Sequence, residues 1–216
     1  MKHFEFMVED SSGKVALEKI LPKLISHDTT YNIHFYKGIG RIPSGLSASS
    51  DPQKRILLDQ LPRILRGLGN AFSNDPPDYR RFAVIICDLD NRDLKEFESE
   101  LITLVNACTP KPTTLLCLAI EEGEAWLLGD PDAVMEAYPN VNRGELMRYE
   151  PDSICGTWEF LADLTIKGGA RALKSLGYQE IGKAKHSWAE NIAPHIDANR
   201  NRSPSFRDFV AKISGI

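Results

Sequence analysis

The sequence lacks any hydrophobic run of the length that a membrane helix requires, which is about 20 residues. Residues 1–6 have neither the long apolar core nor the small-residue cleavage site of a secretory signal peptide. Only four of the 216 residues are cysteine, and no two of them have CxxC spacing. Cys87 and Cys117 lie in apolar runs, where a free thiol acts as a small core residue. We therefore expect a protein of the reducing cytoplasm with no membrane contact.

The sequence also lacks an overall basic charge, since its formal net charge is −4. Binding of nucleic acid would therefore need a local patch, a metal ion or a partner. The segment 12–15 (SGKV) lacks the first glycine and the Ser/Thr of a P-loop. The five histidines fit no Ser-His-Asp or Cys-His arrangement. Asp88-Leu89-Asp90 resembles the DxD motif of haloacid-dehalogenase-type phosphatases, but these carry it on their first strand, whereas here it follows a third.

Strand and helix patterns alternate along residues 1–130. Unbroken apolar runs of β-branched residues predict strands buried on both faces, and apolar residues at helical spacing predict the helices between them. The strand near 31–35 alternates with polar residues, which indicates a position nearer the sheet edge. Asp51-Pro52 is predicted to open the second helix, after an exposed loop at 37–50. The predicted strands are residues 4–8, 31–35, 81–87 and 113–120.

This alternation predicts an α/β fold with a mainly parallel, doubly wound sheet. Residues 131–216 show helical patterns and no clear strand. We therefore predict an α/β domain at 1–130 and a helical C-terminal subdomain at 131–216 that packs on it.

Three predicted strands end in acidic residues, and in a parallel sheet these ends share one edge. Carboxylates crowded at one edge repel each other unless a cation neutralises them, and Mg²⁺ or Mn²⁺ prefers such oxygen ligands. A single acid at a strand end is more often a solvated residue or a helix cap, and for Asp93 we favour the cap. The acids at the three ends are Glu9, then Asp88 and Asp90, then Glu121, Glu122 and Glu124.

Glu9 followed by a helix, with Asp88-x-Asp90 after a later strand, resembles the Toprim (topoisomerase–primase) domain. In that family the glutamate is proposed as a general acid/base and the DxD pair holds Mg²⁺. The resemblance therefore implies a catalytic role for Glu9 and metal binding by Asp88 and Asp90. Asp10 is a departure, because Toprim sequences usually carry glycine after the glutamate.

The segment 122–131 (EGEAWLLGDP) is similar to the Glu-x-Glu-Ala-x-Leu segment of uncharacterised bacterial Toprim-like proteins. Members are often encoded beside SMC- or Rad50-like ATPases, and nucleases of the overcoming-lysogenisation-defect type carry a related domain. A lysine stretch and a late Ser-Pro-Ser-Phe segment also recur, here at 183–185 and 203–206. Lys185, or alternatively Lys183, would then stabilise a phosphate during catalysis. Glu122 or Glu124 would contribute a second metal ligand or an orienting role.

These observations lead to a Mg²⁺-dependent Toprim-type nuclease as the first hypothesis, acting on nucleic acid with a partner ATPase in phage defence. The second hypothesis is a non-catalytic interaction module that binds such an ATPase, which the acidic net charge favours. A small-molecule phosphohydrolase is a third, weaker option.

Overall fold

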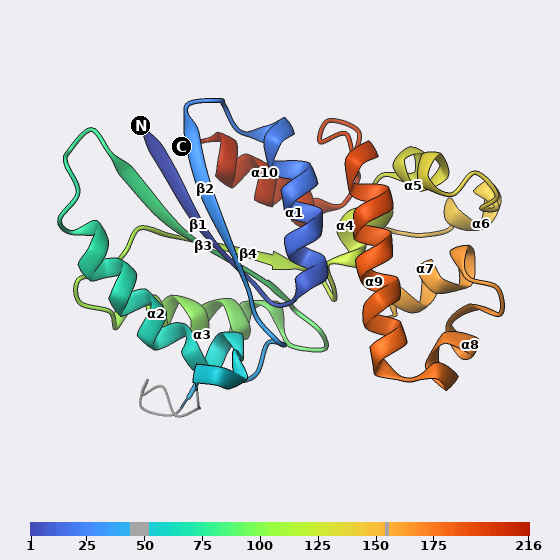
Figure 1. The fold of residues 1–216 in the computed structure, drawn as a ribbon, viewed down its shortest axis with the longest axis horizontal. Helices are drawn as coiled ribbons and strands as arrows, with labels where there is room; N and C mark the ends of the chain where they lie inside the picture. The colour runs from blue at the N-terminus through green and yellow to red at the C-terminus, as the bar shows by residue number, and fades with distance from the viewer. Residues whose placement is uncertain (44–51, 154–155) are drawn as a thin grey trace. The chain divides into compact units, whose positions relative to one another are not determined.

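The structure is a computed structural model that describes residues 1–43, 52–153 and 156–216. Helices and strands alternate up to β4, and the regular elements among the described residues beyond β4 are helices (Figure 1). The elements are β1 (Lys2–Val8), α1 (Ser11–Leu24), β2 (Thr29–Phe35), the 3₁₀ turn η2 (Pro52–Lys54), α2 (Leu57–Phe72), β3 (Arg80–Asp88), α3 (Leu94–Asn106), β4 (Thr114–Ala119), α4 (Glu124–Leu128), α5 (Pro131–Ala137), α6 (Arg143–Leu146), α7 (Thr157–Thr165), α8 (Gly169–Leu176), α9 (Tyr178–Ile192), η3 (Ala193–His195) and α10 (Pro204–Ser214).

The internal contacts divide the chain into two compact units. The first unit comprises residues 1–14 and 26–118, and the second comprises residues 15–25 and 119–216. The second unit thus takes in most of α1 and residues 119–130, which the sequence-based division had assigned to the first domain. No helix among the described residues is long and apolar enough to cross a membrane.

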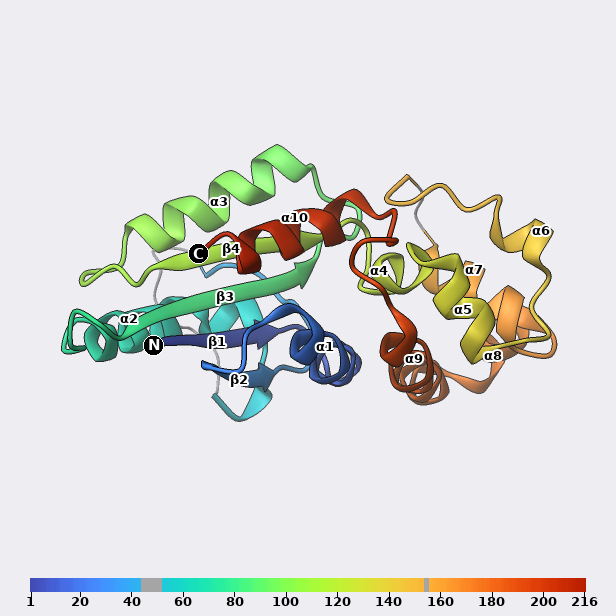
Figure 2. The same ribbon diagram turned by 90° about the horizontal axis from the view of Figure 1, so that it is seen from above.

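The sheet of the first unit has four parallel strands in the order β2-β1-β3-β4, which confirms the predicted α/β class. β1 pairs with β2 on one side and with β3 on the other, from Lys2 opposite Thr29 and Arg80 to Val8 opposite Phe35 and Ile86. β2 lies at the sheet edge, as its alternating pattern predicted. α2 and α3 run along the same face of this sheet (Figures 1 and 2).

The order of the strands creates a switch point between β1 and β3. From β1 the chain first moves outward to β2, then returns past β1 to β3 and continues to β4. The crossovers on the two sides of this point therefore lead in opposite directions. In open α/β sheets the ligand crevice forms at such a point, outside the carboxyl ends of the strands.

The second helix begins later than predicted. Pro52–Lys54 form a single 3₁₀ turn, and α2 starts only at Leu57. Arg55 lies between them with a φ of 53°, a left-handed conformation that cannot continue a right-handed helix. Asp51, the predicted N-cap, lies outside the described residues. The predicted loop 37–50 has no helix or strand in its described part, residues 37–43.

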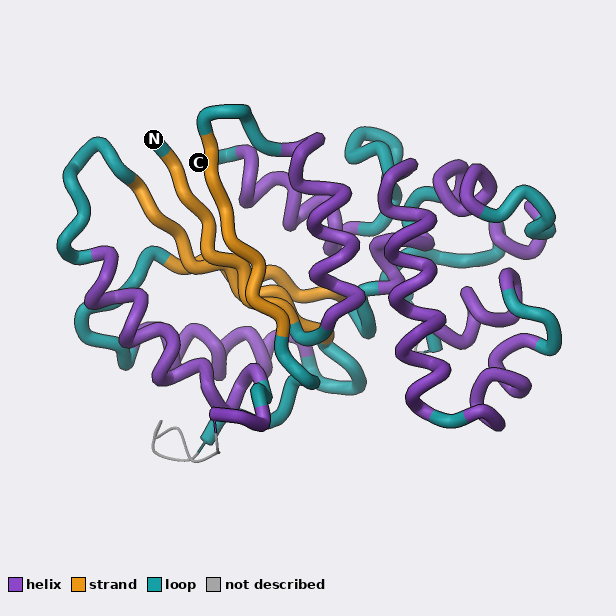
Figure 3. The backbone as a smooth tube through the Cα atoms, in the orientation of Figure 1, coloured by secondary structure: helices purple, strands orange, loops and turns teal. Residues whose placement is uncertain are grey.

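The second unit is helical beyond β4, as predicted for residues 131–216 (Figure 3). Its core includes Trp126, whose side chain stacks on Phe209 with ring centroids 4.9 Å apart and meets Phe206 edge-on. Trp126 is 5% exposed and is thus part of the buried core of this unit.

Candidate metal and phosphate site

Two of the predicted site residues meet at the switch point of the sheet. Val8 pairs with Ile86, so Glu9 and Asp88 emerge next to each other where β1 and β3 end. The backbone N–H of Asp88 donates to Glu9 Oε2 at 3.3 Å. Both side chains are partly exposed. The first unit therefore places two carboxylates at the edge where an α/β sheet binds its ligand.

Asp10, the departure from the Toprim pattern, has a local role at the start of α1. Its Oδ2 accepts from Ser12 Oγ at 2.6 Å, and its Oδ1 accepts from the backbone N–H of Gly13 at 2.7 Å. A carboxylate that binds the free N–H groups of a first helical turn stabilises the helix. The additional acid thus secures the turn that follows Glu9.

Asp90 is held by an arginine that the sequence-based prediction did not assign to the site. Its carboxylate pairs with Arg92 at 2.8 Å, and its own backbone has a φ of 51°. The Arg92 guanidinium also lies over the ring of Phe97, 4.9 Å from the centroid. Asp93 accepts from the backbone N–H of Glu96 at 3.0 Å, so its predicted role as the N-cap of α3 is confirmed. The feature of the sequence that could have identified Arg92 as the partner of Asp90 is its position two residues later.

The other predicted site residues come together within the second unit. Lys185 of α9 pairs with Glu122 at 3.2 Å and with Glu124 at 3.1 Å. All three side chains are largely buried, with exposed fractions of 17%, 17% and 6% for Lys185, Glu122 and Glu124. The ammonium group of Lys185 therefore lies where the sequence predicted a metal ion, next to the carboxylates of Glu122 and Glu124.

This cluster perturbs the protonation of Glu122. Burial raises the pKa of Glu122 to about 7, the negative charge of Glu124 adds to the rise, and Lys185 opposes it. The neighbouring Glu121 accepts hydrogen bonds from the backbone N–H groups of Gly156 and Thr157. Glu122 can thus exchange a proton near neutral pH, while Glu121 connects α7 to the segment after β4.

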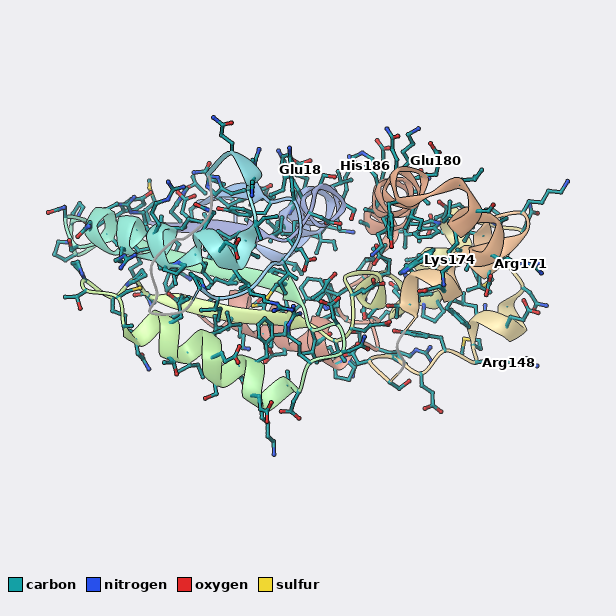
Figure 4. The ribbon with its side chains drawn as sticks, turned by 90° about the horizontal axis from the view of Figure 1, so that it is seen from below. Glu18, Arg148, Arg171, Lys174, Glu180 and His186 are labelled. Carbon is teal, nitrogen blue, oxygen red and sulfur yellow. The ribbon has the colours of Figure 1, made fainter. Side chains whose placement is uncertain are left out.

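Lys183, the predicted alternative to Lys185, lies on a solvent-exposed side of α9. Lys183 pairs with Glu180 at 2.7 Å, and 64% of its side chain is exposed. Figure 4 shows the side chains of Glu180 and His186 on the same helix. The contacts of Lys183 are those of an ordinary surface ion pair, whereas Lys185 faces the buried glutamates.

The late Ser-Pro-Ser-Phe segment has a structural role in the second unit. Ser203 is the N-cap of α10, and its Oγ accepts from the backbone N–H of Phe206 at 3.2 Å. Trp126 Nε1 donates to Ser205 Oγ at 2.9 Å. The nearby Arg200 pairs with the fully buried Asp130 at 2.7 Å. These contacts show that the segment caps α10 and contributes to the core of the second unit.

The carboxylates of the first unit suit a hard divalent ion by their chemistry. Glu9 and Asp88 offer oxygen donors on adjacent strand ends, and Mg²⁺ prefers such donors. Asp88 and Asp90 are the residues that would hold it beside Glu9, with Asp90 exchanging its contact to Arg92. Among residues 1–43, 52–153 and 156–216, no group of three or more His, Cys, Asp or Glu side chains is already arranged to hold a metal.

Comparison with protein families matched a family model that covers almost the whole chain. A comparison with curated proteins found no match, and a comparison with solved structures found none. The matching family model is described as a domain of unknown function (DUF4276) and spans residues 8–214, from the last residue of β1 to the last residue of α10. The chain therefore belongs to the DUF4276 family.

Proposed function

We propose that this protein is a metal-dependent nuclease that hydrolyses phosphodiester bonds at the switch point between β1 and β3. The observation that carries the proposal is the proximity of Glu9 and Asp88, joined by the 3.3 Å hydrogen bond at the ends of two adjacent parallel strands. Acids on either side of a switch point lie where an open α/β sheet receives its ligand. The Toprim resemblance of Glu9 and Asp88-x-Asp90 supports the same assignment.

Each residue has a defined part in this proposal. Asp88 and Asp90 bind the ion, and Glu9 transfers a proton to or from the reacting oxygens as the general acid/base. Bound Mg²⁺ or Mn²⁺ would neutralise the phosphate and activate a water molecule. Lys185, with Glu122 and Glu124, forms a separate cluster within the second unit, for which we retain phosphate binding as a proposal. Its ion pairs with both glutamates hold the ammonium group in place.

Cleavage of nucleic acid tests this proposal directly. Supercoiled plasmid and single-stranded RNA are incubated with the protein and Mn²⁺ or Mg²⁺, and Glu9→Gln and Asp88→Asn are compared with wild type. We expect a loss of at least about 100-fold in rate for both variants, because each removes an acid–base or metal-binding group. Glu98→Gln on the exposed side of α3 is the matched control and keeps full activity.

Calorimetric titration with Mg²⁺ separates binding from cleavage. Asp88→Asn and Asp90→Asn should weaken the binding of the ion, whereas Glu98→Gln should not. Equal binding by wild type and by the double Asp88→Asn/Asp90→Asn variant would exclude the metal site. Cleavage that persists in Glu9→Gln would exclude the proposed acid/base.

A second candidate function is a non-catalytic module that binds a partner ATPase. It is favoured by one observation, which is that protein cations already pair with the predicted metal ligands: Arg92 with Asp90, and Lys185 with Glu122 and Glu124. Under this alternative the acids stabilise the fold, and plasmid stays intact with Mn²⁺ whether or not the ATPase is present. Cleavage abolished by Glu9→Gln decides against it.

A further inference from the structure

The first unit has an open cavity of about 750 Å³ that the proposed metal site does not occupy. One wall is the loop that carries Arg41, and the other is the stretch from Arg92 along α3. Leu58 and Phe97 contribute apolar surface between them. A volume of this size lies within the range of small-molecule sites, which is about 300–1,000 Å³.

Each wall of the cavity has a contact with one of the predicted site acids. The loop wall starts where the backbone N–H of Gly38 donates to the backbone carbonyl of Glu9 at 3.1 Å. The opposite wall starts at Arg92, which pairs with Asp90 at 2.8 Å. The lining of the cavity is therefore connected to the residues that follow β1 and β3 through Gly38 and Arg92.

The loop wall is fixed in place by backbone contacts. The backbone N–H of Leu58 donates to the carbonyl of Ile39 at 2.8 Å, and that of Arg41 donates to Asp59 Oδ1 at 3.3 Å. Gly40 has a φ of 70°, and a Cβ atom at this position would lie 2.1 Å from the side chain of Ile56. The glycine thus permits the close approach of the loop to α2 that positions Arg41.

The lining carries charges of both signs: Arg41 lies on the loop wall, and the α3 wall carries Arg92 together with the acids Asp93, Glu96 and Glu100. Arg41 and Arg92 offer guanidinium groups, which bind phosphate through paired N–H donors. Glu96 and Glu100 on α3 offer carboxylates, which accept from hydroxyl and amino groups. A bare polyanion would be repelled by the α3 wall, whereas a nucleotide combines a phosphate with sugar hydroxyl and base amino donors.

We propose that this cavity binds one nucleotide unit of the substrate, with its phosphate on Arg41 and Arg92 and its sugar and base donors on Glu96 and Glu100. The inference rests on the proposed nuclease function and assigns to that site a subsite for the nucleotide next to the scissile phosphodiester. The apolar surface of Leu58 then contacts the base or sugar.

Equilibrium binding of small probes tests the subsite independently of cleavage. Adenosine 5′-monophosphate, adenosine and inorganic phosphate are titrated into the intact protein by calorimetry or NMR. We expect the monophosphate to bind at least about tenfold more tightly than either adenosine or phosphate, because both walls contribute. Arg41→Met and Glu100→Gln should each weaken it about tenfold, since each removes one charge-assisted hydrogen-bonding partner. Lys95→Met on α3, outside the cavity, is the control.

The outcomes separate this inference from the proposed function. Asp88→Asn should abolish cleavage and retain binding of the monophosphate. Two results would refute the subsite but not the nuclease function, provided that cleavage still depends on Glu9 and Asp88. One is that the monophosphate binds no more tightly than phosphate. The other is that Arg41→Met leaves the affinity for the monophosphate unchanged. If the monophosphate binds as expected and no cleavage occurs, the nuclease assignment fails and the cavity remains a nucleotide site.

Discussion

A substitution of Lys185 tests how much its ion pairs contribute to the stability of the second unit. Replacing Lys185 by Met keeps the length and apolar stem of the side chain but removes the ammonium that faces Glu122 and Glu124. The two carboxylates would then face each other across a largely buried site without a neutralising partner. We expect the variant to fold with a lower free energy of unfolding.

The size of this effect follows from burial. Breaking a buried ion pair by removing one partner costs about 3–5 kcal/mol, because the remaining charge is left uncompensated. Lys185 and Glu122 each keep 17% of the side chain exposed, which lowers the cost by solvent screening. We therefore expect Lys185→Met to lose about 2–3 kcal/mol at pH 8.

The loss should depend on pH in a defined direction. The pKa of Glu122 is already raised to about 7, from an ordinary value of 4.5. Its contribution to stability is thus fully present below pH 4.5 and is lost as the pH rises through 7. Without Lys185 this pKa rises further, because the cation opposes the rise. At pH 5.5, where Glu122 is protonated in the folded variant, the difference from wild type should shrink.

Urea denaturation followed by circular dichroism measures both quantities, at pH 8 and pH 5.5. Lys183→Met is the matched control on the same helix, and it should change the free energy of unfolding by less than about 0.5 kcal/mol, because its pair with Glu180 is exposed. Equal losses for the two lysine variants, or a larger loss for Lys185→Met at pH 5.5 than at pH 8, would refute the reasoning.

Two further predictions concern the first unit. The pKa of Glu5 is lowered to about 2, chiefly by its hydrogen bond with His34, so this stabilisation is present above pH 4.5 and lost as the pH falls towards 2. His34→Ala should cost about 1 kcal/mol at pH 5 and flatten the acid limb of a denaturation series, and an unchanged limb would contradict this. Gly69→Ala would place a Cβ atom 1.9 Å from the carbonyl oxygen of Pro110 and should cost about 2 kcal/mol in thermal unfolding. Gly67→Ala, with open space around it on the same helix, should instead stabilise by about 0.5–1 kcal/mol, and equal effects would contradict the packing argument.

Local patterns in the sequence predicted much of the first unit. The apolar run before Asp88 predicted β3, since burial on both faces of a sheet demands such a run. Asp93 was predicted as a helix cap, because an N-cap depends only on the residues that follow it within one turn. Regular alternation of strands and helices predicted the parallel sheet.

The start of α2 shows where local pattern fails. Asp51-Pro52 is a good helix opening by composition, but the helix begins at Leu57. The left-handed backbone of Arg55 separates the two segments, and the loop before α2 pairs its own backbone with the helix start. These contacts depend on how a whole segment folds back, which no single motif encodes.

The sequence by itself determined which residues are acidic and which of them follow strands, because periodicity and composition are properties of neighbouring residues. Only the tertiary structure decided that β1 and β3 are adjacent, which brings Glu9 to the backbone of Asp88 across 79 positions. It also paired Lys185 with Glu122 and Glu124. The physical reason is that strand order and long-range ion pairs minimise the free energy of the whole packed chain, whereas sequence patterns report only local preferences.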